Sequence, residues 1–173
     1  MFEHWDSFYL LVGGASGGLI GLVFIVVTLL RGGDARDRLR GASIYMSPIV
    51  FNLTAALVLS AIATAPTLPV ALTGGLIGAS ALVGLISSGR VLVMLGVGRV
   101  IQPAHWTDIW AYGVIPTFAY LVVAAASAAV WLMPDWASLM LATSLIGLLV
   151  SSIRNAWDLV TWITAKGSQL DKG

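Results

Sequence analysis

The sequence predicts an all-α polytopic membrane protein, a single transmembrane domain (1–173) with five membrane-crossing helices. Composition, the lengths of the apolar segments and the placement of the basic residues predict this class. Of the 173 residues, 58% are hydrophobic and 10% are charged, whereas a soluble domain is ~45–50% apolar and ~25% charged. The mean hydropathy of +0.94 points the same way.

Five segments are long enough to cross a bilayer, which requires roughly 20 mostly apolar residues. Backbone polar groups in lipid must pair within the segment, which favours helices, and the alternation typical of barrel strands is absent. The breaks are the glycine-flanked polar segment 31–41, the turn "APTLP" (65–69), the connector 98–108 and the turn "MPDW" (133–136). The predicted spans are about 8–30, 44–65, 70–95, 109–133 and 137–163.

Basic residues predict the orientation, because Lys and Arg accumulate in cytoplasmic loops. With five spans, all nine fall on one side: Arg31, Arg36, Arg38, Arg40, Arg90, Arg99, Arg154, Lys166 and Lys172. The opposite side carries Glu3, Asp6 and Asp135. We therefore expect the N-terminus outside and the C-terminus in the cytoplasm. The start lacks the basic residues of a secretory signal, so we expect the first apolar run to stay in the mature protein.

Tryptophans fall near the predicted boundaries, as in the aromatic belts of membrane proteins. Trp5, Trp131 and Trp136 mark one interface, and Trp106, Trp110, Trp157 and Trp162 mark the other. We interpret all of them as anchors.

Small residues recur at four-residue spacing in the first and third spans. Close backbone approach over such residues is a main source of helix association in lipid. The predicted packing residues are Gly13, Gly14, Gly17, Gly18, Gly21, Gly74 and Gly78. They could pack helices within one bundle or between copies. Because five helices cannot easily bury so many small faces, we expect a homo-oligomer.

The first span, "GGASGGLIG" followed by "LVF", resembles that of small uncharacterised bacterial inner-membrane proteins. These proteins open with an aromatic residue, a glycine-rich face and "GLVF"-type residues. The resemblance covers about residues 8–30. It implies a multi-pass location in the inner membrane and no particular activity.

A polar stripe runs along the fifth span. At ~100° per residue, its members fall within an arc of about 120°: Ser144, Gly147, Ser151, Arg154, Asn155, Asp158 and Thr161. Arg154 lies roughly 26 Å from the start of the uncharged run, near the inner boundary, and Arg90 lies at a similar depth.

Two interpretations of the stripe remain open. Arg154 and Asp158 could pair along the helix and anchor at headgroups. Alternatively, the stripe lines a watery vestibule, where intramembrane charges are usually found. On the second interpretation the lining residues are Ser144, Gly147, Ser151, Arg154, Asn155, Asp158, Arg90 and Asn52. Asn52 could instead form an interhelical hydrogen bond.

The sequence lacks the residues that most catalytic or cofactor sites need. It has no cysteine and two histidines, and the predicted topology puts His4 and His105 on opposite sides. No HExxH, GxSxG or P-loop motif occurs. We therefore expect no enzyme activity, no metal or cofactor and no nucleic-acid partner. The bilayer, with anionic lipid headgroups on the cytoplasmic side, is the expected partner of the basic segments.

Three functions fit these features. The leading one is an oligomeric channel or pore in the bacterial inner membrane, with the polar stripe lining the pathway. The alternative is a non-conducting interaction or regulatory subunit that binds through its small-residue faces. A small secondary transporter is third, because five unequal spans contain no clean inverted repeat.

Overall fold

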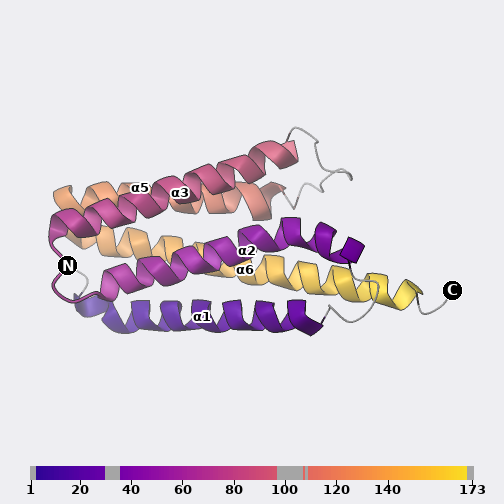
Figure 1. Cartoon of the computed structure of the whole chain (residues 1–173). Coiled ribbons are helices and arrows are strands. Elements are labelled where there is room, and N and C mark those ends of the chain that lie inside the picture. The colour runs from indigo at the N-terminus through magenta and orange to yellow at the C-terminus, as the bar shows by residue number, and fades with distance from the viewer. Residues whose placement is uncertain (1–2, 30–35, 97–106, 108, 171–173) are drawn as a thin grey trace.

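Long helices run side by side along one common direction (Figure 1). A computed structural model describes residues 3–29, 36–96, 107 and 109–170. The 3₁₀ turn η1 (Glu3–Trp5) leads into α1 (Asp6–Leu29), which is followed by α2 (Arg36–Thr64) and α3 (Val70–Gly96). The fourth span starts as a π-helix, η2 (Ile109–Val114), and continues as α5 (Ile115–Leu132). The last helix is α6 (Pro134–Leu170).

The described part of the chain is all-helical, which confirms the predicted fold class at that level. It contains five helices that are long and apolar enough to cross a membrane. Their spanning segments are Asp6–Val26, Ser47–Thr64, Val70–Met94, Ile109–Leu132 and Pro134–Thr161.

Two helices extend further than their apolar segments. α2 starts at Arg36, eight residues before the predicted start of the second span, because Arg and Leu are good helix formers and polarity does not end a helix. The tight connection predicted at "MPDW" is shorter than these four residues. Pro134 is the first residue of α6, a position where its fixed φ suits the helix and its missing N–H costs nothing. Met133 alone separates α5 from α6.

The fourth span begins at Ile109, close to the predicted bound, but its first six residues are not α-helical. Residues Ile109–Val114 form a π-helix, in which the backbone bonds reach five residues back instead of four. Pro116 lies just beyond this turn, at the second position of α5.

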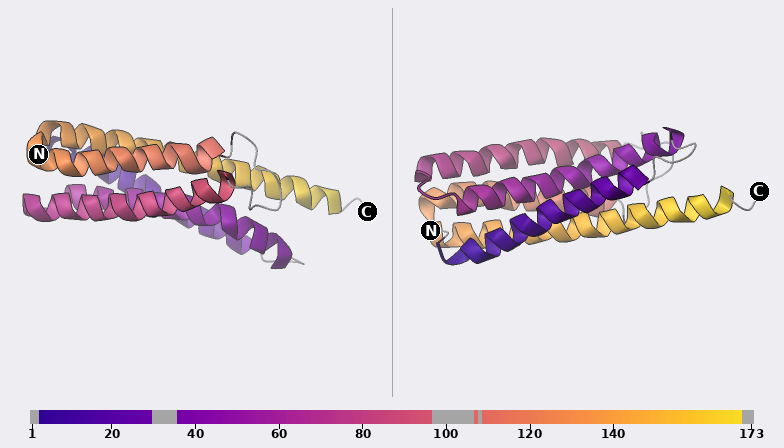
Figure 2. Two further views of the ribbon diagram at one scale, coloured as in Figure 1. Left: turned by 90° about the horizontal axis from the view of Figure 1, so that it is seen from above. Right: turned by 60° about the horizontal axis from the view of Figure 1, so that its bottom comes forward.

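The helices form two groups that share α6. α1 packs mainly on α2, and α5 packs between α3 and α6. The views of Figures 1 and 2 agree that α3 and α5 lie on one side of the bundle, with α1 on the other. α2 and α6 connect the two groups.

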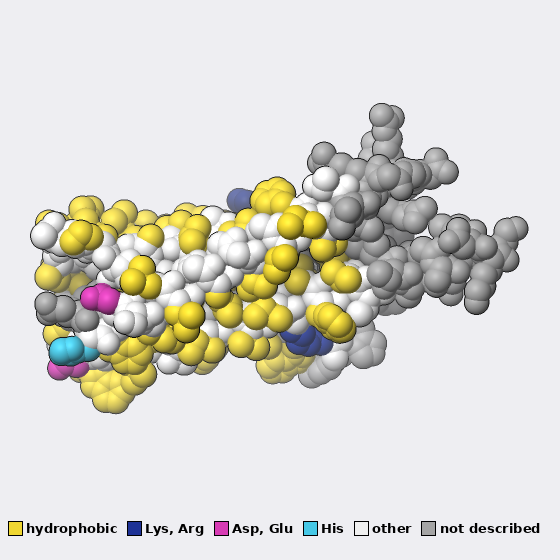
Figure 3. All heavy atoms as spheres, turned by 90° about the horizontal axis from the view of Figure 1, so that it is seen from below, with side chains coloured by type: hydrophobic (Ala, Val, Ile, Leu, Met, Phe, Trp, Pro, Cys, Tyr) yellow, Lys and Arg dark blue, Asp and Glu magenta, His cyan; other side chains and the backbone are white. Residues whose placement is uncertain are grey.

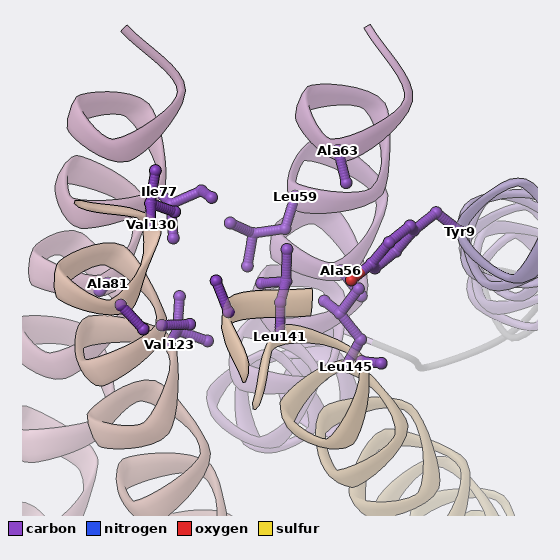
Figure 4. Close-up of a cluster of buried hydrophobic side chains, with 14 of the residues drawn as sticks. Tyr9, Ala56, Leu59, Ala63, Ile77, Ala81, Val123, Val130, Leu141 and Leu145 are labelled. Atoms are coloured by element: carbon purple, nitrogen blue, oxygen red, sulfur yellow. The ribbon is translucent and has the colours of Figure 1, made fainter. Parts of the chain in front are cut away.

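The largest core cluster lies where these helices meet (Figure 4). Leu59 from α2, Val123 from α5 and Leu141 and Leu145 from α6 point toward one another, and all four are buried. Tyr9 enters this cluster from α1, and its hydroxyl donates to the Ser138 carbonyl at 2.8 Å. The bundle is therefore filled by side chains at this level.

The outer surface is largely apolar along the bundle (Figure 3). Leucine, valine, isoleucine and phenylalanine side chains are exposed on all five long helices. In Figure 3 the acidic side chains and the histidine lie at one end of the bundle, and the blue basic side chains lie further toward the other. An apolar belt of this kind suits lipid.

Candidate functional site

The polar stripe of α6 divides into two neighbouring rows. Ser144, Ser151 and Asn155 alternate with Leu141 and Leu148 along one buried seam of the helix. The second row, called the outer row from here on, lies toward the surface. It consists of Gly147, Arg154, Asp158 and Thr161, which are half-buried or exposed.

The buried row meets the π-helix η2. Ser151 Oγ donates to the Ala111 carbonyl at 2.9 Å, and Asn155 Nδ2 donates to the same oxygen at 3.1 Å. In return, the Tyr112 hydroxyl donates to the Asn155 carbonyl at 3.2 Å. Three hydrogen bonds therefore join one turn of the fourth span to one turn of α6. Ser151, Asn155 and Ala111 are called the carbonyl clamp.

Pro116 explains why the Ala111 carbonyl needs donors from another helix. An α-helical N–H bonds the carbonyl four residues back, and a π-helical N–H bonds the one five residues back. Residue 116 would thus serve Tyr112 or Ala111, but proline has no N–H. A buried carbonyl without a donor costs roughly 1–3 kcal/mol. The amide and hydroxyl of the buried row compensate for this loss.

Asn52 belongs to a separate polar contact. Its Oδ1 accepts a hydrogen bond from the Tyr120 hydroxyl at 2.9 Å, and both side chains are buried. The bond joins α2 to α5. In membrane proteins such interhelical bonds contribute about 0.6 kcal/mol on average. Asn52 therefore ties two helices together inside one chain.

Gly84 makes room for that tyrosine. A Cβ built on Gly84 would overlap the ring of Tyr120. The same close approach of α3 and α5 recurs near the other end of the two helices. Ser127 Oγ donates to the Gly74 carbonyl at 2.8 Å, and a Cβ on Gly78 would lie 2.8 Å from that Oγ. Glycines of α3 are thus packed against α5 within the chain.

The glycines of α1 behave differently. A Cβ on Gly13 would lie 3.1 Å from the Ser60 Cβ of α2, and one on Gly17 would lie 3.7 Å from Leu57. Gly14, Gly18 and Gly21 have nothing within 4 Å of a built Cβ. These three exposed residues are called the open glycine face of α1.

Arg154 and Asp158 pair along the outer row. Arg154 Nη2 lies 3.6 Å from Asp158 Oδ2, and the side chains are 47% and 45% exposed. An exposed pair at this spacing contributes ~0.3–0.5 kcal/mol. Arg90 is exposed on α3, and Gly147 is half-buried with an open side. Ser144 Oγ donates to the Met140 carbonyl of its own helix at 2.8 Å.

Three residues of these contacts were not predicted as site residues from the sequence: Tyr112, Tyr120 and Gly84. The available signal was the tyrosines themselves, because a buried tyrosine hydroxyl usually finds a partner.

Some buried oxygens lack a hydrogen-bond partner among the described residues: Ser16 Oγ, Ser60 Oγ, Thr117 Oγ1, Ser152 Oγ and Asn155 Oδ1.

Several predicted positions lie outside the described residues or side chains. They are Glu3, Arg31, Arg36, Arg38, Arg40, Arg99, His105, Trp106, Trp162, Lys166 and Lys172. The described residues contain no group of three or more acidic, histidine or cysteine side chains that could hold a metal ion.

Across residues 3–29, 36–96, 107 and 109–170, the fold and these contacts define a class: all-helical, with five helices fit to cross a membrane and interhelical hydrogen bonds within the bundle. Comparisons with protein-family models, curated proteins and solved structures found no match.

Proposed function

We propose that the protein is a multi-pass subunit of the bacterial inner membrane that acts by lateral association with other membrane helices. The carrying observation is the internal bonding of the buried row of α6. Ser151 and Asn155 hold the Ala111 carbonyl, and Asn52 is bonded to Tyr120. A water path along these side chains inside one subunit would have to replace those bonds.

The proposed orientation has the N-terminus outside and the C-terminus in the cytoplasm. Asp6 and Asp135 begin α1 and α6 at one end of the bundle. Arg90 and Arg154 lie about 20 residues from the starts of α3 and α6, roughly 30 Å along each helix. Cytoplasmic basic residues are the strongest orientation signal in such proteins.

The open glycine face of α1 is the proposed contact surface. Each glycine inside a helix costs about 1 kcal/mol relative to alanine. On α3, Gly74, Gly78 and Gly84 allow close contact with α5. Gly14, Gly18 and Gly21 have no atom within 4 Å of a built Cβ in the described part of the chain. A second copy of α1 could approach closely there, because lipid favours association over small residues.

The test is the size of the assembly in detergent and in nanodiscs, measured by light scattering. Gly18→Leu should leave the helical content unchanged while reducing the assembly to monomers. Gly89→Leu is the matched control, since Gly89 also has nothing within 4 Å of a built Cβ but lies on α3. A monomeric wild type, or a Gly18→Leu variant that assembles normally, would refute the proposal.

An oligomeric pore is the second candidate, and the outer row favours it. Arg154 and Asp158 are half exposed beside the apolar side chains of Ile153 and Trp157, so copies joined along α6 would place this ion pair between subunits. The pathway would then run between bundles rather than through one. Currents in a reconstituted bilayer whose selectivity reverses in Arg154→Glu would favour the pore over the interaction subunit.

A further inference from the structure

We propose that residues 109–114 form a two-state turn, held in π register by Ser151 and Asn155 and able to return to α register when those bonds are lost. The inference is independent of the proposed function. It rests on the π-helix itself, on the carbonyl clamp and on Pro116.

The Ala111 carbonyl has two alternative sets of donors. In α register its donor is the N–H of Ile115, four residues on. In π register that N–H reaches back to Trp110 instead. Residue 116 offers no replacement, because it is a proline. The Ala111 oxygen is then bonded by Ser151 Oγ and Asn155 Nδ2, and Asn155 is almost fully buried, with 1% of its surface exposed.

Each register leaves one backbone carbonyl without its helical donor. In α register the Ala111 carbonyl has its backbone donor. The Tyr112 carbonyl receives no N–H from residue 116, and the proline ring crowds it. π register relieves that crowding but needs the clamp for Ala111. π-helices are rare and usually limited to a single turn, so tertiary contacts must select this one.

Two further contacts fix the π register on its other sides. The Tyr112 hydroxyl reaches the Asn155 carbonyl, which ties the turn to α6 a second time. Gly113 packs against α3, where a built Cβ would lie 2.6 Å from Leu92 Cδ1. A larger residue at 113 would require the Leu92 side chain to move.

A change of register has a defined geometric consequence. The chain before the turn moves by one residue, about 100° around the axis and 1.5 Å along it. At a helix radius of about 2.3 Å, a Cα is displaced by roughly 3.8 Å. Trp110, which is 45% exposed, would turn toward the direction that Ile109 now faces.

The experiment is a spin-label distance between Trp110→Cys and Phe24→Cys, a pair that is easy to prepare because the chain has no cysteine. Both positions are exposed. Adding Ser151→Ala and Asn155→Leu removes the clamp, and we expect the distance to shift by several ångströms. Ser144→Ala is the matched control, because Ser144 bonds only within α6 in the described contacts, and it should leave the distance unchanged.

Pro116→Ala tests the same inference from the other side. The N–H it supplies can bond Tyr112 in α register or Ala111 in π register, whereas loss of the ring removes the crowding of the Tyr112 carbonyl in α register alone. The change therefore favours α register, and the distance should shift in the same direction with the clamp intact. If the clamp variant does not fold, Pro116→Ala decides alone. An unchanged distance in Pro116→Ala, or in a folded clamp variant, would overturn the proposal.

Discussion

At the scale of single residues, polar groups and glycines act in pairs on different helices. The Asn52–Tyr120 bond exists because Gly84 lets the tyrosine ring lie against α3. The Ser151 and Asn155 donors matter because Pro116 leaves a carbonyl short of a partner. In each case one residue leaves a space or a carbonyl without a donor. A residue far away in sequence then occupies the space or supplies the donor.

Gly84→Ala should lower stability by about 1–3 kcal/mol, the usual cost of overpacking a filled core. The added methyl would overlap the Tyr120 ring. Gly89→Ala on the same helix is the control, because a built Cβ there meets nothing within 4 Å. It should be neutral or stabilising through helix propensity. Denaturant unfolding followed by circular dichroism measures both, and equal behaviour of the two variants would contradict the packing described.

The sequence predicted the stripe but not its division into rows. A helical wheel placed Ser151 and Arg154 in one arc of about 120°, yet one side chain is buried and the other is 47% exposed. The two rows differ by a small rotation that periodicity alone does not resolve. What separates them is the partner of Ser151, a carbonyl on the fourth span, and sequence spacing on α6 carries no information about it.

At the scale of elements, hydropathy located the spans better than the helix ends. The five spanning segments were predictable because lipid requires length and apolarity together. The first residues of α2 were missed because they are polar yet helical. The π-helix was missed because the donors that stabilise a wider turn lie on α6, far from residues 109–114 in the sequence.

Gly13 and Gly14 are neighbours on α1 with opposite surroundings. Gly13→Leu should separate α1 from α2, because a built Cβ on Gly13 already lies 3.1 Å from Ser60, and the melting temperature should fall. Gly14→Leu should lower it much less, since nothing within the described chain lies within 4 Å there. Thermal unfolding in detergent compares the two. A stable Gly13→Leu variant would show that the contact with α2 is not required.

At the scale of the whole molecule, the ends of the bundle differ in charge. Asp6 and Asp135 lie at the start of α1 and of α6, and Arg90 and Arg154 lie roughly 30 Å away along their helices. We predict that a reporter active only in the cytoplasm works when fused after Gly173 and fails when fused before Met1. The reverse pattern, or activity at both ends, would contradict the predicted orientation.

The central claim is that the buried row of α6 is bonded inside the subunit rather than facing water. Thiol labelling in membranes tests it most directly, with Ser144→Cys and Ser151→Cys compared with Arg154→Cys and Asp158→Cys. A thiol reacts as the thiolate, which forms poorly in an apolar interior. We predict that a small charged reagent added from the cytoplasmic side modifies the two outer-row cysteines and spares the two buried ones. Equal reaction at all four positions would mean that water follows the whole stripe, and it would contradict the account.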